Sequence, residues 1–170
     1  AFSKLKCITS HIDFFSRTED LEEKVSTQDI IYVGGGNTKS MLAVWREWNL
    51  HEILKKAYEN GIVMSGVSAG AICWFDKGIT DSYADKLEII DCLGIVKGIA
   101  CPHFDEEKDR KPYVYEIIQK EIIKSCICIE GDCALHIKNN IEYYSVNFGK
   151  YKKKCLRIFN ENNQLREELL

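Results

Sequence analysis

Short apolar runs alternate with amphipathic segments along most of the chain. The runs at 29–33 (DIIYV), 62–66 (IVMSG) and 126–130 (CICIE) are rich in β-branched residues, which is typical of buried strands. Apolar positions recur at helical spacing in residues 37–61, which predicts one or two helices, and residues 111–125 predict another amphipathic helix. Strands that alternate with helices indicate an α/β domain with a mostly parallel sheet and helices on both faces.

The two ends of the chain carry further predicted elements. Residues 6–14 resemble a strand, and residues 18–28 a short helix capped by Thr18. Near the other end we expect two strands that meet in a hairpin, a final strand and a polar tail, at 133–140, 141–146, 153–159 and 160–170. An α/β domain normally has a strand ahead of the first one seen here, so an N-terminal strand and helix are expected to be missing.

Length and composition agree with one globular domain. A chain of 170 residues is expected to form a single domain spanning 1–170, with its catalytic core in 29–146. The net charge of −3 predicts no nucleic-acid partner, and no apolar run approaches the roughly 20 residues that span a bilayer.

The cysteine pattern predicts a reducing compartment. There are eight cysteines, and none of them forms a C-x-x-C pair. Most lie in apolar runs, which favours buried thiols in a cytoplasmic protein. Cys101 and His103 form C-x-H, but no second pair completes a zinc site, so neither a metal nor another cofactor is expected.

The stretch 61–75, GIVMSGVSAGAICWF, predicts a nucleophile. Gly66 to Gly70 form G-x-S-x-G around Ser68, between a predicted strand and a predicted helix. That context defines a nucleophile elbow, in which a strained turn lifts the serine hydroxyl out of the sheet. The alternative is a glycine-rich turn whose serine only caps the helix.

A glycine-rich loop precedes the elbow by one helical region. Gly34 to Gly36 end the strand at 29–33, and Asn37 or Thr38 can cap the helix that follows. One N–H of this loop and the N–H of Ala69 together would form an oxyanion hole. A phosphate-binding loop is disfavoured because neither common glycine spacing is present.

A serine nucleophile needs a base and an orienting acid. Among the four histidines, His103 follows a short apolar strand and Pro102, whereas His11, His51 and His136 occupy ordinary strand or helix positions. Glu130 ends a strand in the same way, and we expect it to accept a hydrogen bond from His103. Asp81 and Asp105 compete with it for the acid's role.

Four motifs taken together resemble the aspartyl dipeptidase (peptidase E) family, which is related to cyanophycinase. They are YVGGGNT, GVSAGA, CPHFD and IEGDCALHI, in that order, and the similarity spans about residues 29–146. The resemblance implies a sheet related to that of class I glutamine amidotransferases. It also implies a serine peptidase that cleaves small peptides, including dipeptides with N-terminal aspartate.

The resemblance also implies roles for individual residues. Ser68 is the implied nucleophile, His103 the base and Glu130 the acid. Gly35 or Gly36 would act with Ala69 as oxyanion donors, and Asp81 would be a supporting acid. The segment after His103 is shorter than in those dipeptidases and lacks a clear counterpart of the arginine that binds the substrate carboxylate. Arg110 is the nearest candidate for that function, and Asn37 is a second substrate-binding candidate.

Three other functions remain open. One is a catalytically inactive relative that only binds peptides. Another is a glutamine amidotransferase-like hydrolase, although such enzymes use a cysteine nucleophile and residue 68 is serine. The third is an α/β-hydrolase esterase, which would use the chain order Ser68, Asp81, His136.

Overall fold

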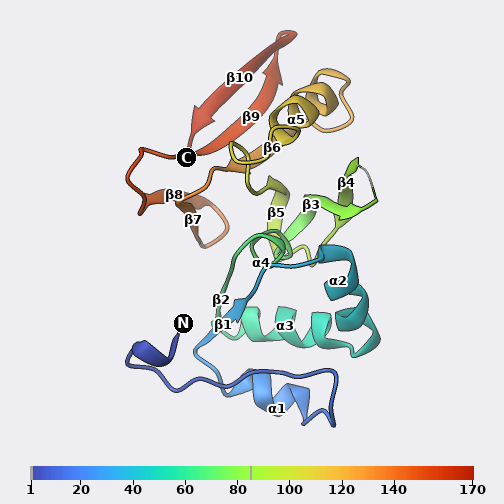
Figure 1. The fold of residues 1–170 in the computed structure, drawn as a ribbon, viewed down its shortest axis with the longest axis vertical. Helices are drawn as coiled ribbons and strands as arrows, with labels where there is room; N and C mark the ends of the chain where they lie inside the picture. Colours follow the sequence, from blue (N-terminus) through green and yellow to red (C-terminus); the bar gives the residue numbers. More distant parts are fainter. Residues whose placement is uncertain (1, 85) are drawn as a thin grey trace.

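The computed structural model describes residues 2–84 and 86–170 and shows an α/β architecture with a mixed central sheet (Figure 1). Its helices are a 3₁₀ turn η1 (Phe2–Lys4) and α1 (Leu21–Ser26), α2 (Thr38–Glu47), α3 (Leu50–Glu59), α4 (Ala69–Ile72) and α5 (Arg110–Gln119). Its strands are β1 (Ile30–Val33), β2 (Val63–Gly66), β3 (Phe75–Tyr83), β4 (Lys86–Asp91), β5 (Val96–Cys101), β6 (Ser125–Ile129), β7 (Cys133–Lys138), β8 (Glu142–Asn147), β9 (Cys155–Glu161) and β10 (Gln164–Leu169).

The main sheet has six strands in the order β10-β9-β6-β5-β3-β4. The pairs β3–β5 and β5–β6 are parallel, whereas β3–β4, β6–β9 and β9–β10 are antiparallel. The expectation of a mostly parallel sheet is therefore wrong for this sheet. The physical reason is that β4 directly follows β3 and β10 directly follows β9, which gives antiparallel pairing without a crossover helix, while β9 reaches β6 only after the β7–β8 hairpin and runs antiparallel to it.

Strands β1 and β2 form a separate parallel pair, with Ile30 opposite Val63 and Val33 opposite Gly66. One face of this pair packs on the core through Ile31, Val33 and Met64. On the other face, Ile30, Tyr32 and Val63 keep 61%, 48% and 55% of their surface exposed. Helices thus do not cover both faces of this pair, in contrast to the expectation.

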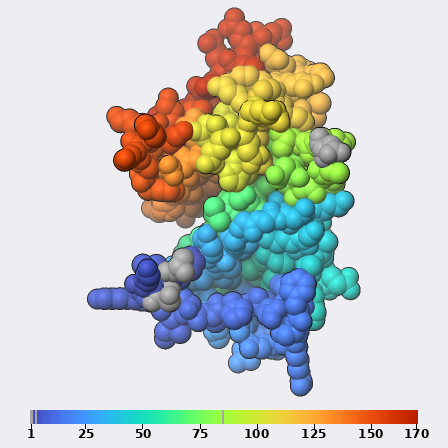
Figure 2. Space-filling view, viewed as in Figure 1, coloured from blue at the N-terminus to red at the C-terminus, as the bar shows by residue number. Residues whose placement is uncertain are grey.

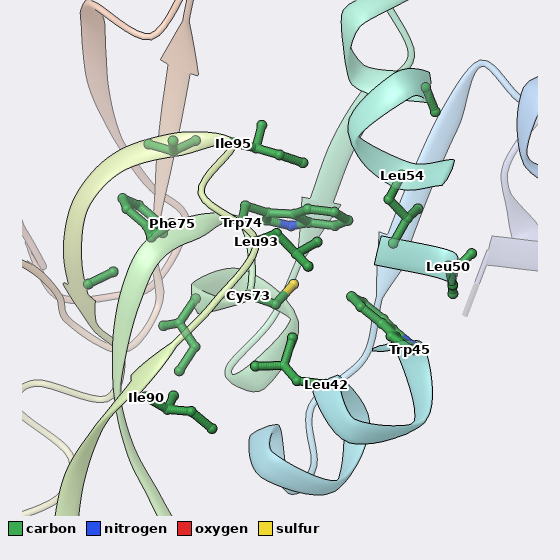
Figure 3. Packing of buried hydrophobic residues seen from close by; sticks show 14 of the residues in the cluster. Leu42, Trp45, Leu50, Leu54, Cys73, Trp74, Phe75, Ile90, Leu93 and Ile95 are labelled. Atoms are coloured by element: carbon green, nitrogen blue, oxygen red, sulfur yellow. The ribbon is translucent and has the colours of Figure 1, made fainter. Parts of the chain in front are cut away.

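The first hydrophobic core joins this pair to the helices around it. Leu42 from α2 and Leu54 from α3 are almost fully buried against Trp74, and the rings of Trp45 and Trp74 lie 6.3 Å apart (Figure 3). Burial of such side chains contributes roughly 1.5–3 kcal/mol each, so this cluster fixes the position of α4 between the sheets.

A second core lies under α5 on the main sheet. Val114 and Ile118 of the helix pack on Ile79, Cys101 and Ile158 of the strands.

Figure 2 shows the N-terminal half in blue and cyan at one end of the molecule and the C-terminal half in yellow to red at the other. None of the helices in the described ranges is both long and apolar enough to cross a bilayer.

Several predicted elements differ from the observed ones. Residues 6–14 form no strand, and α1 is capped by Asp20, whose side chain accepts from the Glu23 N–H, rather than by Thr18. The polar tail at 160–170 contains β10, which pairs with β9 through a turn at Asn162 and Asn163. Both asparagines have positive φ, a conformation that asparagine tolerates better than most residues.

Candidate active site

Ser68 occupies a strained turn between β2 and α4. Its φ is 56° and its ψ is −118°, a region that non-glycine residues rarely adopt. At the start of α4 the Gly70 N–H donates to the Val67 carbonyl and the Ala71 and Ile72 N–H groups donate to the Ser68 carbonyl, which leaves the Ala69 N–H as the first donor of the helix without a backbone acceptor in the described residues. The sequence therefore forms an elbow here that presents the hydroxyl away from the strand.

The glycines on either side of Ser68 allow very close backbone packing. A Cβ at Gly66 would lie 2.2 Å from the Gly70 carbonyl oxygen, and a Cβ at Gly70 would lie 2.1 Å from the Val33 carbonyl oxygen. Both distances are far below van der Waals contact with backbone atoms. Only glycine fits at these two positions, so the motif is required by the packing of the elbow on β1.

His103 lies beside the serine. Its Nε2 is 2.9 Å from Ser68 Oγ, and its Nδ1 is 2.7 Å from Glu106 Oε2. The histidine has a φ of 52°, so the turn after β5 bends sharply and directs the ring back toward the elbow. A hydroxyl, an imidazole and a carboxylate are thus linked in series, the arrangement that activates a serine nucleophile.

Glu130 does not make the bond to His103 that the sequence predicted. Its Oε2 accepts a hydrogen bond from the Lys154 N–H at 2.8 Å, and Glu106 takes the position on His103 Nδ1 instead. The physical reason is local: the Glu106 N–H donates to the His103 carbonyl, and this tight turn brings the Glu106 side chain under the ring. The Glu106 carboxyl lies against Gly131, where a Cβ would come within 2.6 Å of its Cδ.

Asp105 anchors the turn that carries His103. Its Oδ1 accepts from the Gly131 N–H at 2.8 Å, and its Oδ2 pairs with Lys153 Nζ. Burial alone would raise the pKa of Asp105, but the hydrogen bonds from Lys153 and Gly131 outweigh burial and hold this pKa below its ordinary value. Asp105 therefore contacts the chain after β6 rather than the imidazole.

The glycine loop after β1 approaches the serine from the other side. A Cβ at Gly35 would lie 3.3 Å from Ser68 Cβ and 3.8 Å from Ser68 Oγ. Gly36 has a φ of 146°, which favours glycine. Within residues 2–84 and 86–170, the N–H groups of Gly35 and Ala69 donate to no backbone acceptor, so both can donate to a ligand oxygen.

Arg110 lies close to the site but is already paired within the protein. The side chain is 3% exposed, its Nε donates to Glu107 at 2.7 Å, and its Nη1 donates to the Ile79 carbonyl at 3.1 Å. The carboxylate of Asp81 lies 3.7 Å from Nη2. This placement does not fit the expected contact of Arg110 with a substrate carboxylate, because the buried guanidinium already donates to Glu107 and to the Ile79 carbonyl of the same chain.

Asn37 also has a local role. Its Oδ1 accepts from the Ser40 N–H at 2.9 Å and caps α2, and its Nδ2 donates to the Ser82 carbonyl at 3.3 Å. These contacts hold the side chain at the helix start. The expectation that Asn37 binds substrate is not supported by this geometry, although the residue directly follows the glycine loop.

The remaining candidates lie elsewhere or are chemically unsuited. His136 belongs to β7 and stacks 5.8 Å from the ring of Tyr144, so it is not the base for Ser68, and the esterase order finds no support. Burial raises the pKa of the Cys73, Cys101 and Cys128 thiols, which disfavours a cysteine nucleophile. In the described ranges, no group of three or more His, Cys, Asp or Glu side chains is arranged to hold a metal ion.

Comparison with known proteins adds to this geometry. The model of peptidase family S51 matches residues 1–142. The chain belongs to peptidase family S51. An S51 match of this extent includes the elbow, the glycine loop and the His103 turn.

One curated relative and one solved structure are similar to this S51 chain. The uncharacterized peptidase YgaJ of Bacillus subtilis strain 168 is 40% identical over 168 residues, which are 98% of this chain and 72% of YgaJ. A crystal structure from Listeria monocytogenes EGD-e, provisionally assigned to peptidase E, has a TM-score of 0.59 and 19% identity. The match covers 76% of this chain and 65% of the Listeria chain, so at this identity it supports the fold alone.

Two residues at the site, Glu106 and Ser82, could not be identified from sequence motifs in the way that Ser68 and His103 could. Glu106 is three residues after His103, and the acidic run DEE that follows the histidine is the one feature that pointed to a nearby carboxylate. Ser82, which contacts the start of α2, has no motif at all. Both depend on loop conformations that hydrophobic periodicity does not report.

Proposed function

We propose that this chain acts as a serine peptidase on small peptides, with Ser68 as the nucleophile and His103 as the general base. The supporting observation is the 2.9 Å contact between His103 Nε2 and Ser68 Oγ at a strained elbow, in a chain of family S51. Hydrogen-bond reach between a serine and a base, on a turn that exposes the hydroxyl, is the geometry of acyl transfer.

The reaction has two stages. Ser68 Oγ attacks the scissile carbonyl carbon while its proton passes to His103 Nε2, and the carbonyl oxygen becomes an oxyanion. The N–H groups of Ala69 and of Gly35 or Gly36 stabilise that charge. Collapse of the intermediate breaks the C–N bond, and the leaving amine takes the proton from His103. Water then attacks the acyl-enzyme by the same route and releases Ser68.

Glu106 is the carboxylate that we assign to His103 Nδ1, in place of Glu130. It fixes the ring orientation and stabilises the imidazolium that forms during proton transfer. Asp81 is a supporting acid at the rim of the site, beside Arg110.

The substrate is proposed to be a short peptide, and the site offers little support for N-terminal aspartate. The one arginine that was expected to bind its carboxylate is internally paired. A hollow of about 510 Å³ next to Asp81 is lined by Glu107, Asp109, Glu116 and Lys86, among others, but by neither Ser68 nor His103, so its charge does not bear on the substrate. Because Arg110 is paired internally, we expect peptides without N-terminal aspartate to be cleaved at least as well as Asp-X peptides.

A fluorophosphonate probe combined with a peptide panel tests this proposal. The probe phosphonylates an activated serine and expels fluoride, so mass spectrometry is expected to find it on Ser68. Ser68→Ala should abolish labelling and reduce kcat by roughly 10⁴-fold or more. Ser26→Ala, at the exposed end of α1, is the matched control and should behave as the native chain. A folded native chain that neither labels nor cleaves any peptide would instead be a peptide-binding relative.

A further inference from the structure

A buried cluster of hydroxyl groups connects the glycine loop to the end of β3. In the described ranges, the buried polar or charged residues are Thr38, Thr80 and Arg110, with Thr38 and Thr80 each 2% exposed. Thr80 Oγ1 donates to Thr38 Oγ1 at 3.2 Å and lies 2.8 Å from Ser82 Oγ. The Thr38 N–H donates to Ser82 Oγ at 2.8 Å. Buried polar groups of this kind stabilise one arrangement strongly when every member is satisfied.

The hydrogen-bond capacities of these groups fix the direction of the protons. A hydroxyl has one proton and two lone pairs. The proton of Thr80 goes to Thr38, and one Thr80 lone pair already accepts from the Ser82 N–H at 3.2 Å. The Ser82 hydroxyl must therefore donate to the other lone pair and accept from the Thr38 N–H. Ser82 is thus the residue that connects β3 to the first N–H of α2.

We propose that Ser82 is a positioning residue that sets the glycine loop for oxyanion binding, an inference that rests on the proposed peptidase function. Ser82 contacts the segment directly after the loop at two points: Oγ accepts from the Thr38 N–H, and the carbonyl accepts from Asn37 Nδ2. Losing this anchor would let the loop donor move away from the developing negative charge, where small displacements are costly to the rate.

Close packing holds only the start of the loop, where the Val33 and Gly34 carbonyls lie against Gly70. A Cβ at Gly34 or Gly36 would meet no atom of the described residues within 4 Å, whereas a Cβ at Gly35 would contact Ser68. The loop is therefore held by β1 at one end and by Asn37 and Thr38 at the other. Ser82 holds the second end, and it lies on β3 where the register of the β3–β4 pairing shifts between Thr80 and Tyr83.

The test compares Ser82→Ala with Ser82→Thr, which keeps the hydroxyl, and with Ser26→Ala as the control. Enzyme concentrations are set by active-site titration with the fluorophosphonate. Ser82→Ala is expected to lower kcat and the rate of inactivation by the probe about tenfold each, less than the 10²–10³-fold of deleting an oxyanion donor outright. KM should stay within about twofold, since ground-state contacts are unchanged. Ser82→Thr should recover most of the loss.

A second readout follows the anchor without using activity. Amide hydrogen exchange at the Thr38 N–H should accelerate about tenfold or more in Ser82→Ala, because that N–H loses its acceptor. If Ser82→Ala does not fold, Thr80→Val replaces it: this variant keeps the side-chain volume but removes the group that holds the Ser82 hydroxyl, so kcat and Thr38 exchange should change in the same directions by smaller factors.

The outcomes separate this inference from the proposed function. Ser82→Ala with native kcat and inactivation rate per titrated site overturns the positioning role, even if its melting temperature falls. A native chain that the probe does not label at Ser68 refutes the proposed function. In that case, faster Thr38 exchange in Ser82→Ala still supports the anchor, and unchanged exchange overturns it.

Discussion

Replacing the two candidate acids one at a time gives the sharpest test of the site. Glu106→Gln removes the negative charge 2.7 Å from His103 Nδ1. A hydrogen bond to a charged group contributes roughly 1.5–3 kcal/mol, and the lower end applies because the Glu106 side chain is 52% exposed and solvent screens it. About 1.5 kcal/mol corresponds to a loss of roughly tenfold in kcat, and an amide that forces the wrong imidazole tautomer would extend the loss toward 100-fold.

Glu130→Gln is the matched comparison. Its contact is an accepted hydrogen bond from the Lys154 N–H at 2.8 Å, which a glutamine oxygen can also accept. We therefore expect kcat within about threefold of the native value. Both variants are assayed on the same peptide, with sites titrated by the fluorophosphonate. A near-native Glu106→Gln together with a loss of several orders of magnitude in Glu130→Gln would refute the assignment and show that His103 uses Glu130 during turnover.

Three further predictions follow from the contacts around the site. Arg110→Met should lower the free energy of unfolding by about 2–3 kcal/mol in urea titrations, which is less than for a fully buried ion pair because the Glu107 side chain is 42% exposed. The same variant should reduce kcat/KM equally for Asp-X and neutral peptides. A loss confined to Asp-X peptides would show that Arg110 contacts the substrate. Because the pKa of Asp105 is lowered in the folded protein, its contribution to stability is present above the ordinary carboxyl pKa of 3.8 and is lost as the pH falls through the folded pKa. Asp105→Asn should therefore lose less melting temperature than the native chain does below about pH 4. An unchanged dependence of melting temperature on acid pH would contradict this. Gly66→Ala should cost about 3 kcal/mol or more and remove probe labelling, since its Cβ would lie 2.2 Å from a backbone oxygen; a stable and fully labelled variant would show that the elbow can relax.

Hydrophobic periodicity predicted the elements that have strong local signals. The strand before the glycine loop, the helical region at 37–61 and the β7–β8 hairpin all occur. The prediction left open one or two helices at 37–61; there are two, and Asn49, with a φ of 54°, separates α2 from α3. The tail was misread because its turn is formed by Asn162 and Asn163 without glycine or proline. A strand at 6–14 was wrong because apolar alternation forms a strand only where a neighbouring strand pairs with it, and none does in the described residues.

Some residues of the candidate site could likewise be predicted from local sequence, and others could not. Ser68 could be found because the elbow needs glycines at fixed spacing, and His103 because it follows a predicted strand. The acid could not, since the choice between Glu106 and Glu130 depends on the positive φ of His103 and on the turn that follows it. Hydrogen bonds between segments 44 or 45 residues apart, such as those of Ser82, leave no trace in local patterns.

The close packing of Gly70 on the Val33 carbonyl has a consequence for how this site can diversify. A Cβ at Gly70 would lie 2.1 Å from that carbonyl oxygen, so the nucleophile turn and the start of the glycine loop are in direct backbone contact. A substitution that shifts one of them must therefore shift the other. The side chains of Asp81 and Tyr83 share none of this backbone contact, so substitutions there should leave the elbow and the start of the glycine loop in place. A change of specificity is therefore better sought at positions such as Asp81 and Tyr83, with Ser82, His103 and Glu106 kept.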